Sequence, residues 1–568
     1  MKDPGAASSR VEQVLNSLSL ERQVGQVLMV GFQEPWPPAA FLDRVRSGAV
    51  GNVVLFSRNL TTPDAARAMI RRIQEAALEA SLPGLIISTD QEGGSVTRLR
   101  QGTTWFPSAM AVGAAGDPDL AEQLAAAMGA QLRASGITMN LAPDADVNIN
   151  PENPVIGTRS FGADPERVAG MVRAFIRGLH AARVAAVAKH FPGHGDTSVD
   201  SHLDLPVIPH DRARLEAVEL APFRAAIEEG VDGIMAAHVA FPSIDPDRTR
   251  PATLSPAVLR GLLRDELGFD GLILTDCLEM RAVSDRFSPG EAALRAFEAG
   301  ADLILMSHTE ERQRAAYEAL LEAARTGRIS EDRLRASVRR VLALKERLGL
   351  LTGDLDQLLP DRPFSEAVNV DEADALAREA ARRAVRVWRR NGQTPPGERP
   401  GALRPWLETG RYRGILVLEL GEGQRTLAEE GGDPPLRLAR ALEAALASAG
   451  LGAQGGAFTV EEVSVPAGLV PEAEAGARER LRKALGEEHF LPVVVTRNAA
   501  RHPDQLAWVR EVFGLCPDMV TVVAAGLPDD LESLPAHPAL FLATYGDQPP
   551  HVEAAAAVLA GTFPAPVP

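Results

Sequence analysis

Short apolar runs alternate with helical stretches along the first 350 residues, and the runs end in polar side chains. Eight runs can be counted: VGQVLMVGF from Val24, GNVVLFSRN from Gly51, GLIISTDQEGG from Gly84, ITMNLAPDAD from Ile137, VAAVAKHFPGHG from Val184, GIMAAHVAF from Gly233, GLILTDCLEM from Gly271 and ADLILMSHT from Ala301. Strand–helix alternation of this length predicts parallel strands, and eight units match a closed (β/α)8 barrel. An open doubly wound sheet would alternate similarly, so the barrel prediction depends on the count of eight.

Two of the intervening helices have recognisable start signals. Thr62 and Pro63 form an N-cap followed by a first-turn proline, and the segment from Ser288 to Glu291 has the pattern of a capping box. The residues that then fall on one face of the helix after Pro63 are Ala66, Met69, Ile70, Ile73 and Ala77.

A change of pattern after the eighth run predicts a second domain. The segment 351–372 contains two prolines and a weak apolar period, so it is interpreted as a linker between a catalytic barrel (1–350) and a C-terminal domain (373–568). A helix is expected from Ala373 to Arg390. Strand-like runs then begin at Gly414, Leu491, Val520 and Ala539, which predicts a smaller α/β sandwich.

Composition and charge narrow the class of protein. Apolar residues make up 45% and charged residues 24% of the 568 positions, as is usual for a soluble globular protein. The net charge is −17 and no Lys/Arg-rich tract is present, so nucleic acid is not an expected partner. The N-terminus lacks the apolar core of a signal peptide, no run is long enough to span a membrane, and Cys277 and Cys516 give no disulfide framework. We therefore predict a cytoplasmic protein.

Candidate chemistry gathers at the ends of the predicted strands, where barrel enzymes build their sites. The polar side chains at those ends are Asp90, Asn140, Asp144, Lys189, His190, His238, Asp276, Ser307 and His308. The densest group is the run KHFPGHGDTSVDSHLDLP from Lys189 to Pro206, with three histidines and three aspartates. Such a cluster at the point where a buried strand becomes a loop indicates a functional site rather than a merely solvated loop.

Five motifs in a fixed order resemble glycoside hydrolase family 3, in particular its bacterial β-N-acetylglucosaminidases of peptidoglycan recycling. They are DQEGGSVTRL from Asp90, NLAPDADVNINPENPVIGTRSFG from Asn140, KHFPGHGDTSVDSH from Lys189, MAAHVAFP from Met235 and LTDCLEM from Leu274. The resemblance covers residues from about 20 to 350. In the second half it is limited to the overall layout of the family's two-domain members.

The resemblance implies a metal-independent, cofactor-independent, retaining exo-β-N-acetylglucosaminidase that acts on cell-wall fragments. Retention requires a nucleophile on one face of the sugar and an acid/base at the leaving oxygen. By resemblance Asp276 is the nucleophile, and His202 is the acid/base with Asp200 as its partner. Imidazole, with a pKa of about 6.5, can give and take a proton near neutrality, and an aspartate fixes its tautomer.

The same resemblance assigns substrate binding to Asp90, Arg98, Arg159, Lys189 and His190. Carboxylates accept hydrogen bonds from sugar hydroxyls, and the basic side chains donate to hydroxyls or to an acetamido carbonyl. Arg98 and Arg159 could instead form structural ion pairs beneath the site. His238 and Asp144 are interpreted as supports of the pocket, and Gly193 and Gly195 as a source of flexibility for the loop that carries His202.

Three other functions remain open at this point. Zinc could be held by His190, His194, Asp196, Asp200 and His202, although ligands from one loop are unusual in a barrel metallohydrolase. A neutral histidine does not repel an anionic acceptor, so phosphate could replace water and the enzyme would be a phosphorylase. A catalytically silent sugar-binding protein would need neither Asp276 nor the Asp200/His202 pair. The oligomeric state and the role of the C-terminal domain are not predicted.

Overall fold

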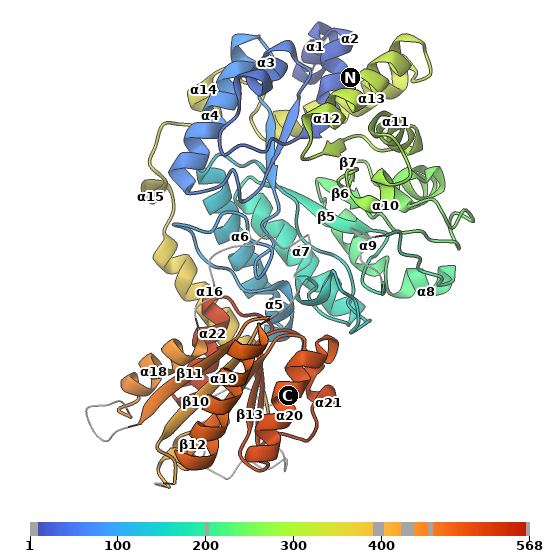
Figure 1. Ribbon diagram of the computed structural model, residues 1–568. Helices are drawn as coiled ribbons and strands as arrows, with labels where there is room; N and C mark the ends of the chain where they lie inside the picture. The colour runs from blue at the N-terminus through green and yellow to red at the C-terminus, as the bar shows by residue number, and fades with distance from the viewer. Residues whose placement is uncertain are drawn as a thin grey trace.

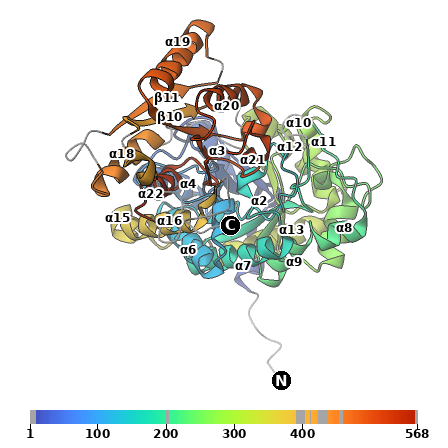
Figure 2. The ribbon, with the colours of Figure 1, turned by 90° about the horizontal axis from the view of Figure 1, so that it is seen from below.

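The computed structural model describes residues 9–198, 204–389, 403–409, 411–421, 437–451, 458–467 and 469–563. It forms two bodies, a larger one in blue to yellow and a smaller one in orange and red (Figure 1). Viewed from below, the smaller body is offset to one side of the larger (Figure 2). None of the helices in the described ranges combines the length and apolarity needed to cross a bilayer.

The larger body is an eight-stranded parallel barrel. Its strands are β1 (Leu28–Val30), β2 (Asn52–Leu55), β3 (Ile86–Thr89), β4 (Met139–Asn140), β5 (Ala185–Phe191), β6 (Gly233–Ala236), β7 (Leu272–Thr275) and β8 (Ile304–Met306). Each of the eight predicted runs contains one strand. The ladder runs β7-β6-β5-β4-β3-β2-β1-β8, and a parallel bridge between Leu274 and Leu303 joins β7 to β8. The barrel prediction is therefore confirmed.

Helices surround the barrel strands and cover their outward apolar side chains. The helices of this part are α1 (Arg10–Ser17), α2 (Leu20–Gln26), α3 (Ala39–Ser47), α4 (Pro63–Glu79), α5 (Ala109–Ala115), α6 (Pro118–Ala134), α7 (Pro165–Ala181), α8 (Arg212–Ala217), α9 (Ala221–Glu228), α10 (Arg281–Ser284), α11 (Pro289–Ala299), α12 (Glu310–Arg325) and α13 (Glu331–Arg347), with a π-helix at Ala257–Glu266. The predicted caps are confirmed, because Thr62 accepts from the Ala65 N–H and Ser288 from the Glu291 N–H. All five residues of the predicted apolar face of α4 are buried.

The chain then passes through α14 (Leu355–Leu358), α15 (Phe364–Ala367) and α16 (Val370–Ala384). The helix expected from Ala373 to Arg390 is wrong at its C-terminal end, because Arg386–Arg389 form strand β9. β9 pairs antiparallel with β14 (Leu540–Ala543). Val387 and Trp388 are strand-forming residues, and they pair with Leu542 and Phe541 of β14.

The smaller body is a layered α/β domain with a six-stranded sheet in the order β11-β10-β12-β13-β14-β9. The remaining strands are β10 (Gly414–Leu420), β11 (Thr459–Val465), β12 (Phe490–Thr496) and β13 (Thr521–Ala524). Its helices are α17 (Arg404–Leu407), α18 (Leu438–Ser448), α19 (Pro471–Arg482), α20 (Pro503–Leu515), α21 (Asp530–Ser533) and α22 (Pro549–Leu559). One apolar cluster joins the sheet to α18 and α22 and another joins it to α19 and α20, so helices cover both faces.

Helix α5 of the barrel docks directly onto the second domain. Met110 and Ala111 belong to the same buried apolar cluster as residues of α19 and α20. At the start of the helix, the Ser108 hydroxyl donates to the Tyr545 carbonyl at 2.6 Å and the Ser108 N–H donates to His551 Nε2 at 3.2 Å. This contact fixes the carboxyl end of β14 and the start of α22 close to the barrel.

One buried cation in the barrel gives a test of the fold by pH. Lys345 on α13 is fully buried, and its Nζ donates to Gln26 Oε1 at 2.7 Å and to the Gly51 carbonyl at 2.9 Å. Burial lowers the pKa of Lys345 to about 7. Between that pH and about 10.4, the ordinary lysine value, the unfolded chain holds a proton that the folded chain has released, so folding becomes more favourable as the pH rises.

Replacing Lys345→Met should therefore remove this pH dependence. We expect the free energy of unfolding of the variant, relative to that of the wild type, to be highest at pH 7 and to fall towards pH 10, as measured by urea unfolding. Lys483→Met, at a side chain that is 63% exposed, is the matched control and should show no such trend. An equal difference at pH 7 and pH 10 would show that Lys345 keeps its proton in the folded protein.

Candidate active site

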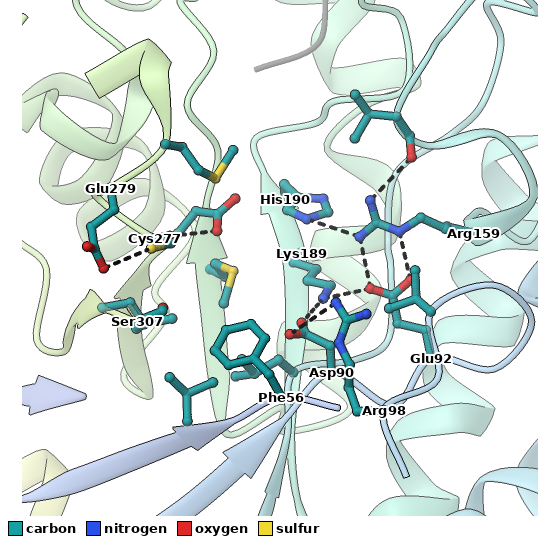
Figure 3. A pocket seen from close by; sticks show the side chains of 18 of the residues that line it. Phe56, Asp90, Glu92, Arg98, Arg159, Lys189, His190, Cys277, Glu279 and Ser307 are labelled. Carbon is teal, nitrogen blue, oxygen red and sulfur yellow. Dashed lines mark hydrogen bonds and ion pairs between the residues drawn. The ribbon is translucent and has the colours of Figure 1, made fainter. Parts of the chain in front are cut away.

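A cavity of about 380 Å³ lies at the carboxyl ends of the barrel strands (Figure 3). Its apolar floor includes Val54, Leu141, Met235 and Leu305, and Phe56 stands beside it. Its polar lining consists of Asp90, Glu92, Arg98, Arg159, Lys189, His190, His194, Asp276, Cys277, Glu279, Arg281, Ser307 and His308. Six of the eight site residues expected from the sequence thus meet in one cavity: Asp90, Arg98, Arg159, Lys189, His190 and Asp276.

A buried ion-pair network forms one wall of this cavity (Figure 3). Lys189 Nζ lies 2.7 Å from Asp90 Oδ1 and 2.7 Å from Glu92 Oε1. Arg159 donates to Glu92 through two bonds of 2.8 Å, from Nε and Nη2. Both Glu92 and Arg159 are almost completely buried. Such charge-assisted, bidentate pairing holds the side chains in one geometry.

The network also fixes the charges of its members. Although burial alone would raise it, the positive charges of Arg159 and Lys189 hold the pKa of Glu92 well below its usual range. Burial opposes the charge of Lys189, but the carboxylates of Asp90 and Glu92 raise its pKa above the ordinary value. The wall therefore presents the carboxyl groups of Asp90 and Glu92 and the cations of Arg159 and Lys189 to the cavity.

Arg98 takes part in this wall more loosely. Its Nη2 lies 3.9 Å from Asp90 Oδ2, and its side chain is 5% exposed. Its backbone N–H donates to Gln91 Oε1 at 2.8 Å. Arg98 and Arg159 thus make ion pairs and line the cavity at the same time, so the two interpretations offered for them are compatible.

His190 is held by carboxylates behind it. Its Nδ1 lies 2.7 Å from Asp146 Oδ2, its Nε2 lies 3.4 Å from Arg159 Nη2, and Asp144 Oδ2 lies 3.8 Å from Nδ1. Burial lowers the pKa of His190 to about 4, and the charge of Arg159 acts in the same direction. Burial also raises the pKa of both Asp144 and Asp146. The imidazole is therefore neutral, with a position set by Asp146.

The start of the loop that leads to Asp200 and His202 is tightly packed. Asn153 Nδ2 donates to the His194 carbonyl at 2.8 Å, and Thr197 Oγ1 lies 2.9 Å from His194 Nδ1. A Cβ on Gly195 would lie 1.9 Å from the Val147 carbonyl oxygen, and Gly193 has a φ of +141°. These two glycines allow close backbone approach, so replacing them with alanine would disrupt this packing and would not test the flexibility proposed from the sequence.

Asp276 lies on the opposite side, directly after β7. The Cys277 N–H donates to Asp276 Oδ1 at 2.6 Å, and the Cys277 carbonyl lies 2.9 Å from His238 Nε2. His238 Nδ1 lies 2.8 Å from Thr253 Oγ1. His238 thus supports the backbone next to Asp276, as expected from the sequence, and a strand end places the carboxylate in the cavity.

The structure adds residues that the sequence interpretation missed. Glu92 is the central acceptor of the ion-pair network, and its place two residues after Asp90 in the motif DQEGG was a usable signal. Asp146 orients His190, whereas Asp144 was chosen from the same motif. Glu279 accepts from the backbone N–H groups of His308 and Thr309 at 2.6 and 3.0 Å. Asp200 and His202 lie outside the described residues.

The zinc alternative can be compared with the described part of the site. His190 is close to Asp144 and Asp146, and a second group is formed by Asp196, His210 and Glu219. Hydrogen bonds already occupy the first group, because Asp146 accepts from the backbone N–H groups of His190 and His194 as well as from the His190 ring. Of the other zinc ligands suggested by the sequence, His194 belongs to neither group and Asp196 belongs only to the second. Neither residue therefore shares a group with His190 in the described part of the chain.

Comparison with known proteins places the chain in a family. Residues 19–344 match the model of the glycosyl hydrolase family 3 N-terminal domain, which is more than half of the chain. The chain therefore belongs to glycosyl hydrolase family 3, a family of glycoside hydrolases.

Individual relatives are consistent with this. The chain is 41% identical over 278 residues to a β-hexosaminidase of Methylococcus capsulatus, covering 48% of this chain and 80% of that one. It is 38% identical over 322 residues to β-hexosaminidase A of Pseudoalteromonas piscicida, covering 53% of this chain and about half of that protein's length, 54%. Among solved structures, a family 3 β-N-acetylglucosaminidase from Paenibacillus sp. str. FPU-7 is 39% identical with a TM-score of 0.85, covering 97% of this chain and 99% of that one.

Glu92→Gln tests whether the ion-pair network holds the site together. Removing one partner of a buried pair leaves charge uncompensated and costs about 3–5 kcal/mol of stability. We expect a lower melting temperature and, because Arg159 and Lys189 are displaced, a fall in kcat/KM of about a hundredfold. Glu122→Gln, which breaks a half-exposed pair with Arg177, is the control and should alter neither measurement appreciably. Unchanged activity in Glu92→Gln would contradict the central role of this carboxylate.

The neutral state of His190 can be observed directly. Because burial and Arg159 lower its pKa to about 4, the ring should remain neutral from pH 8 down to about pH 5. Nitrogen chemical shifts of the histidine rings, assigned with a His190→Gln variant, would report this. Titration of His190 near the ordinary value of about 6.5 would show that the ring is far better solvated than its packing indicates.

Proposed function

We propose that the chain is a retaining exo-β-N-acetylglucosaminidase. The observation that carries the proposal is the meeting, in one cavity, of the Asp276 carboxylate with a wall built from Asp90, Glu92, Arg159, Lys189 and His190. A carboxylate on one side and a set of fixed donors and acceptors on the other is the arrangement that displacement at a sugar carbon requires. Similarity to β-hexosaminidases and to a solved β-N-acetylglucosaminidase supports the sugar.

In this proposal Asp276 attacks the anomeric carbon and forms a covalent glycosyl-enzyme intermediate. His202, with its partner Asp200, protonates the leaving oxygen and then activates the water that releases the sugar. The bond from the Cys277 N–H to Asp276 Oδ1 orients the nucleophile. The roles of His202 and Asp200 rest on the family motif KHFPGHGDTSVDSH.

The opposite wall binds the sugar. Asp90 accepts from ring hydroxyls while Lys189 holds it in place, and Arg98 donates from the same side. Arg159 and the neutral ring of His190 lie next to each other and are suited to an acetamido carbonyl and to a further hydroxyl. A cavity of about 380 Å³ is large enough for a terminal sugar.

The proposed natural substrates are cell-wall fragments with a terminal N-acetylglucosamine, which the peptidoglycan-recycling members of the family imply. The cytoplasmic location expected from the sequence is part of the same proposal.

Asp276→Asn tests the nucleophile. With an aryl N-acetyl-β-D-glucosaminide as substrate, we expect kcat to fall by at least about 10⁴-fold, because removal of a covalent nucleophile leaves only binding and electrostatic contributions. Asp285→Asn, at a half-exposed position on the same segment, is the matched control and should keep wild-type turnover. Turnover that survives in Asp276→Asn would mean that another group attacks the sugar.

His202→Ala tests the acid/base. Nitrophenol leaves without much help from an acid, whereas a sugar leaving group needs a proton. We expect the variant to lose far more activity on an N-acetylglucosamine disaccharide than on the nitrophenyl glycoside in its first turnover, measured by rapid quench. Equal losses on both substrates, or a product that is a sugar phosphate rather than free sugar, would contradict the proposed role in hydrolysis.

A further inference from the structure

Three side chains of metal-binding type meet outside the catalytic cavity, beside the two ends of the segment that carries Asp200 and His202. Asp196 directly precedes the segment 197–209, His210 directly follows it, and Glu219 lies between α8 and α9. One ligand atom from each of the three lies within 4.8 Å of the other two. The described residues that line the catalytic cavity include none of them. The group is therefore separate from the reacting atoms, although it is next to the acid/base segment in the chain.

The contacts within the group leave it short of positive charge. His210 Nε2 lies 2.5 Å from Asp196 Oδ2. Glu219 Oε1 lies 3.3 Å from Arg214 Nη2, on α8. Two carboxyl groups thus share one guanidinium and one imidazole, and a metal ligand must be a neutral imidazole. A cation bound between them would supply the missing charge.

Glu219 adds an observation that is independent of the His210–Asp196 hydrogen bond. Its side chain is 3% exposed, and within the described residues its Oε2 has no hydrogen-bond partner. Its stem is confined, because a Cβ on Gly193 would lie 2.8 Å from Glu219 Cβ and 2.9 Å from its Cγ. Leaving a buried carboxylate oxygen unsatisfied is unfavourable. The carboxyl group that faces Asp196 and His210 therefore lacks a ligand.

The geometry allows an ion to enter and to be coordinated. The side chains of His210 and Asp196 are 29% and 23% exposed, so the group is open to solvent on that side and closed by Glu219 behind. Tetrahedral Zn²⁺ with bonds of about 2.0–2.1 Å holds its ligand atoms about 3.3 Å apart. This separation lies between the 2.5 Å of the hydrogen bond and the 4.8 Å limit of the group, so shifts of about 1.5 Å or less would form the site.

We propose that Asp196, His210 and Glu219 form a binding site for a divalent transition-metal ion, for which Zn²⁺ is the probe. One imidazole nitrogen and two carboxylate oxygens suit this class of ion, whereas Ca²⁺ takes six to eight oxygen ligands. Water completes the coordination on the exposed side. The ion joins the two ends of the segment 197–209 to the start of α9 and takes no part in the reaction at the sugar. The inference does not rest on the proposed function.

The experiment measures zinc binding to the full-length protein after treatment with a chelator. Calorimetric titration with zinc chloride gives the affinity and the stoichiometry, and melting temperatures are recorded with zinc and with chelator. The proteins are the wild type, Asp196→Asn, His210→Gln, Glu219→Gln and the control His537→Gln, which removes an exposed histidine elsewhere. The melting temperature in chelator shows which variants are folded. His202→Ala is included because the sequence also allows zinc to bind on the catalytic segment.

We expect the wild type to bind one zinc ion per chain and to melt at a higher temperature with zinc, because an ion that binds only the folded state stabilises it. Loss of an outer partner of a metal ligand already costs about 10–100-fold in affinity, so loss of a ligand should weaken binding by at least about 100-fold. Glu219→Gln is the sharpest variant, since it keeps the shape of the side chain and leaves the His210–Asp196 hydrogen bond in place. His537→Gln and His202→Ala should bind zinc as the wild type does.

No binding by the wild type, or equal binding by Glu219→Gln and His210→Gln, would mean that the three side chains only hydrogen-bond, and would overturn the inference. Zinc binding that is lost in His202→Ala and kept in Glu219→Gln would place the ion on the catalytic segment and would overturn it as well. None of these results depends on turnover of a glycoside. Failure of the metal site is therefore distinguishable from failure of the proposed function.

Discussion

The bidentate pairing of Arg159 with Glu92, extended by Lys189 to Asp90, is the interaction on which the rest of the site depends. It joins the loop after β3 to β5 and to the short helix at Gly157–Arg159, so three separate segments are held in one geometry. Taking these charges out of water is costly, and only their mutual pairing makes the arrangement stable. The same pairing leaves a polar wall with fixed charges opposite Asp276, beside a histidine that burial keeps neutral.

This network also connects the catalytic cavity with the second domain. Arg159 is the last residue of the segment 153–159. Asn153, its first residue, donates to the His194 carbonyl and to Thr197 Oγ1, and so holds the start of the loop that leads to Asp200 and His202. Residues 153–158 also line a second cavity, which lies between the two domains. Ser108, on the barrel, anchors the loop after β14 and the start of α22 at the interface with the second domain. Residues of the segment 153–159 thus line both cavities and hold the start of the loop that leads to Asp200 and His202.

Much of this could be predicted from the sequence, because strand ends in a barrel converge. The eight apolar runs gave the strands, and the polar residues after them gave six members of the cavity. The ion-pair partners were harder to predict, because pairing between separate segments is not visible in the spacing of residues along the sequence. Glu92 and Asp146 are absent from the predicted site for this reason, although each lies two residues after a predicted residue, Asp90 and Asp144 respectively. Strand β11, TVEEVSV, lies at an edge of the sheet and has an alternating rather than an apolar pattern. The pattern around Arg386–Arg389 predicts a helix, because the strand β14 that pairs with this segment lies about 150 residues away in the chain.

Identification of the group that carries the sugar tests the central claim most directly. A 5-fluoro derivative of N-acetylglucosaminyl fluoride, which slows formation and hydrolysis of the intermediate to different extents, would be incubated with the enzyme and the protein digested for mass spectrometry. We expect one added fluorosugar on the peptide that contains Asp276, and none in Asp276→Asn. An adduct on a different peptide would contradict it, as would turnover of the reagent by the wild type with inversion at the anomeric carbon.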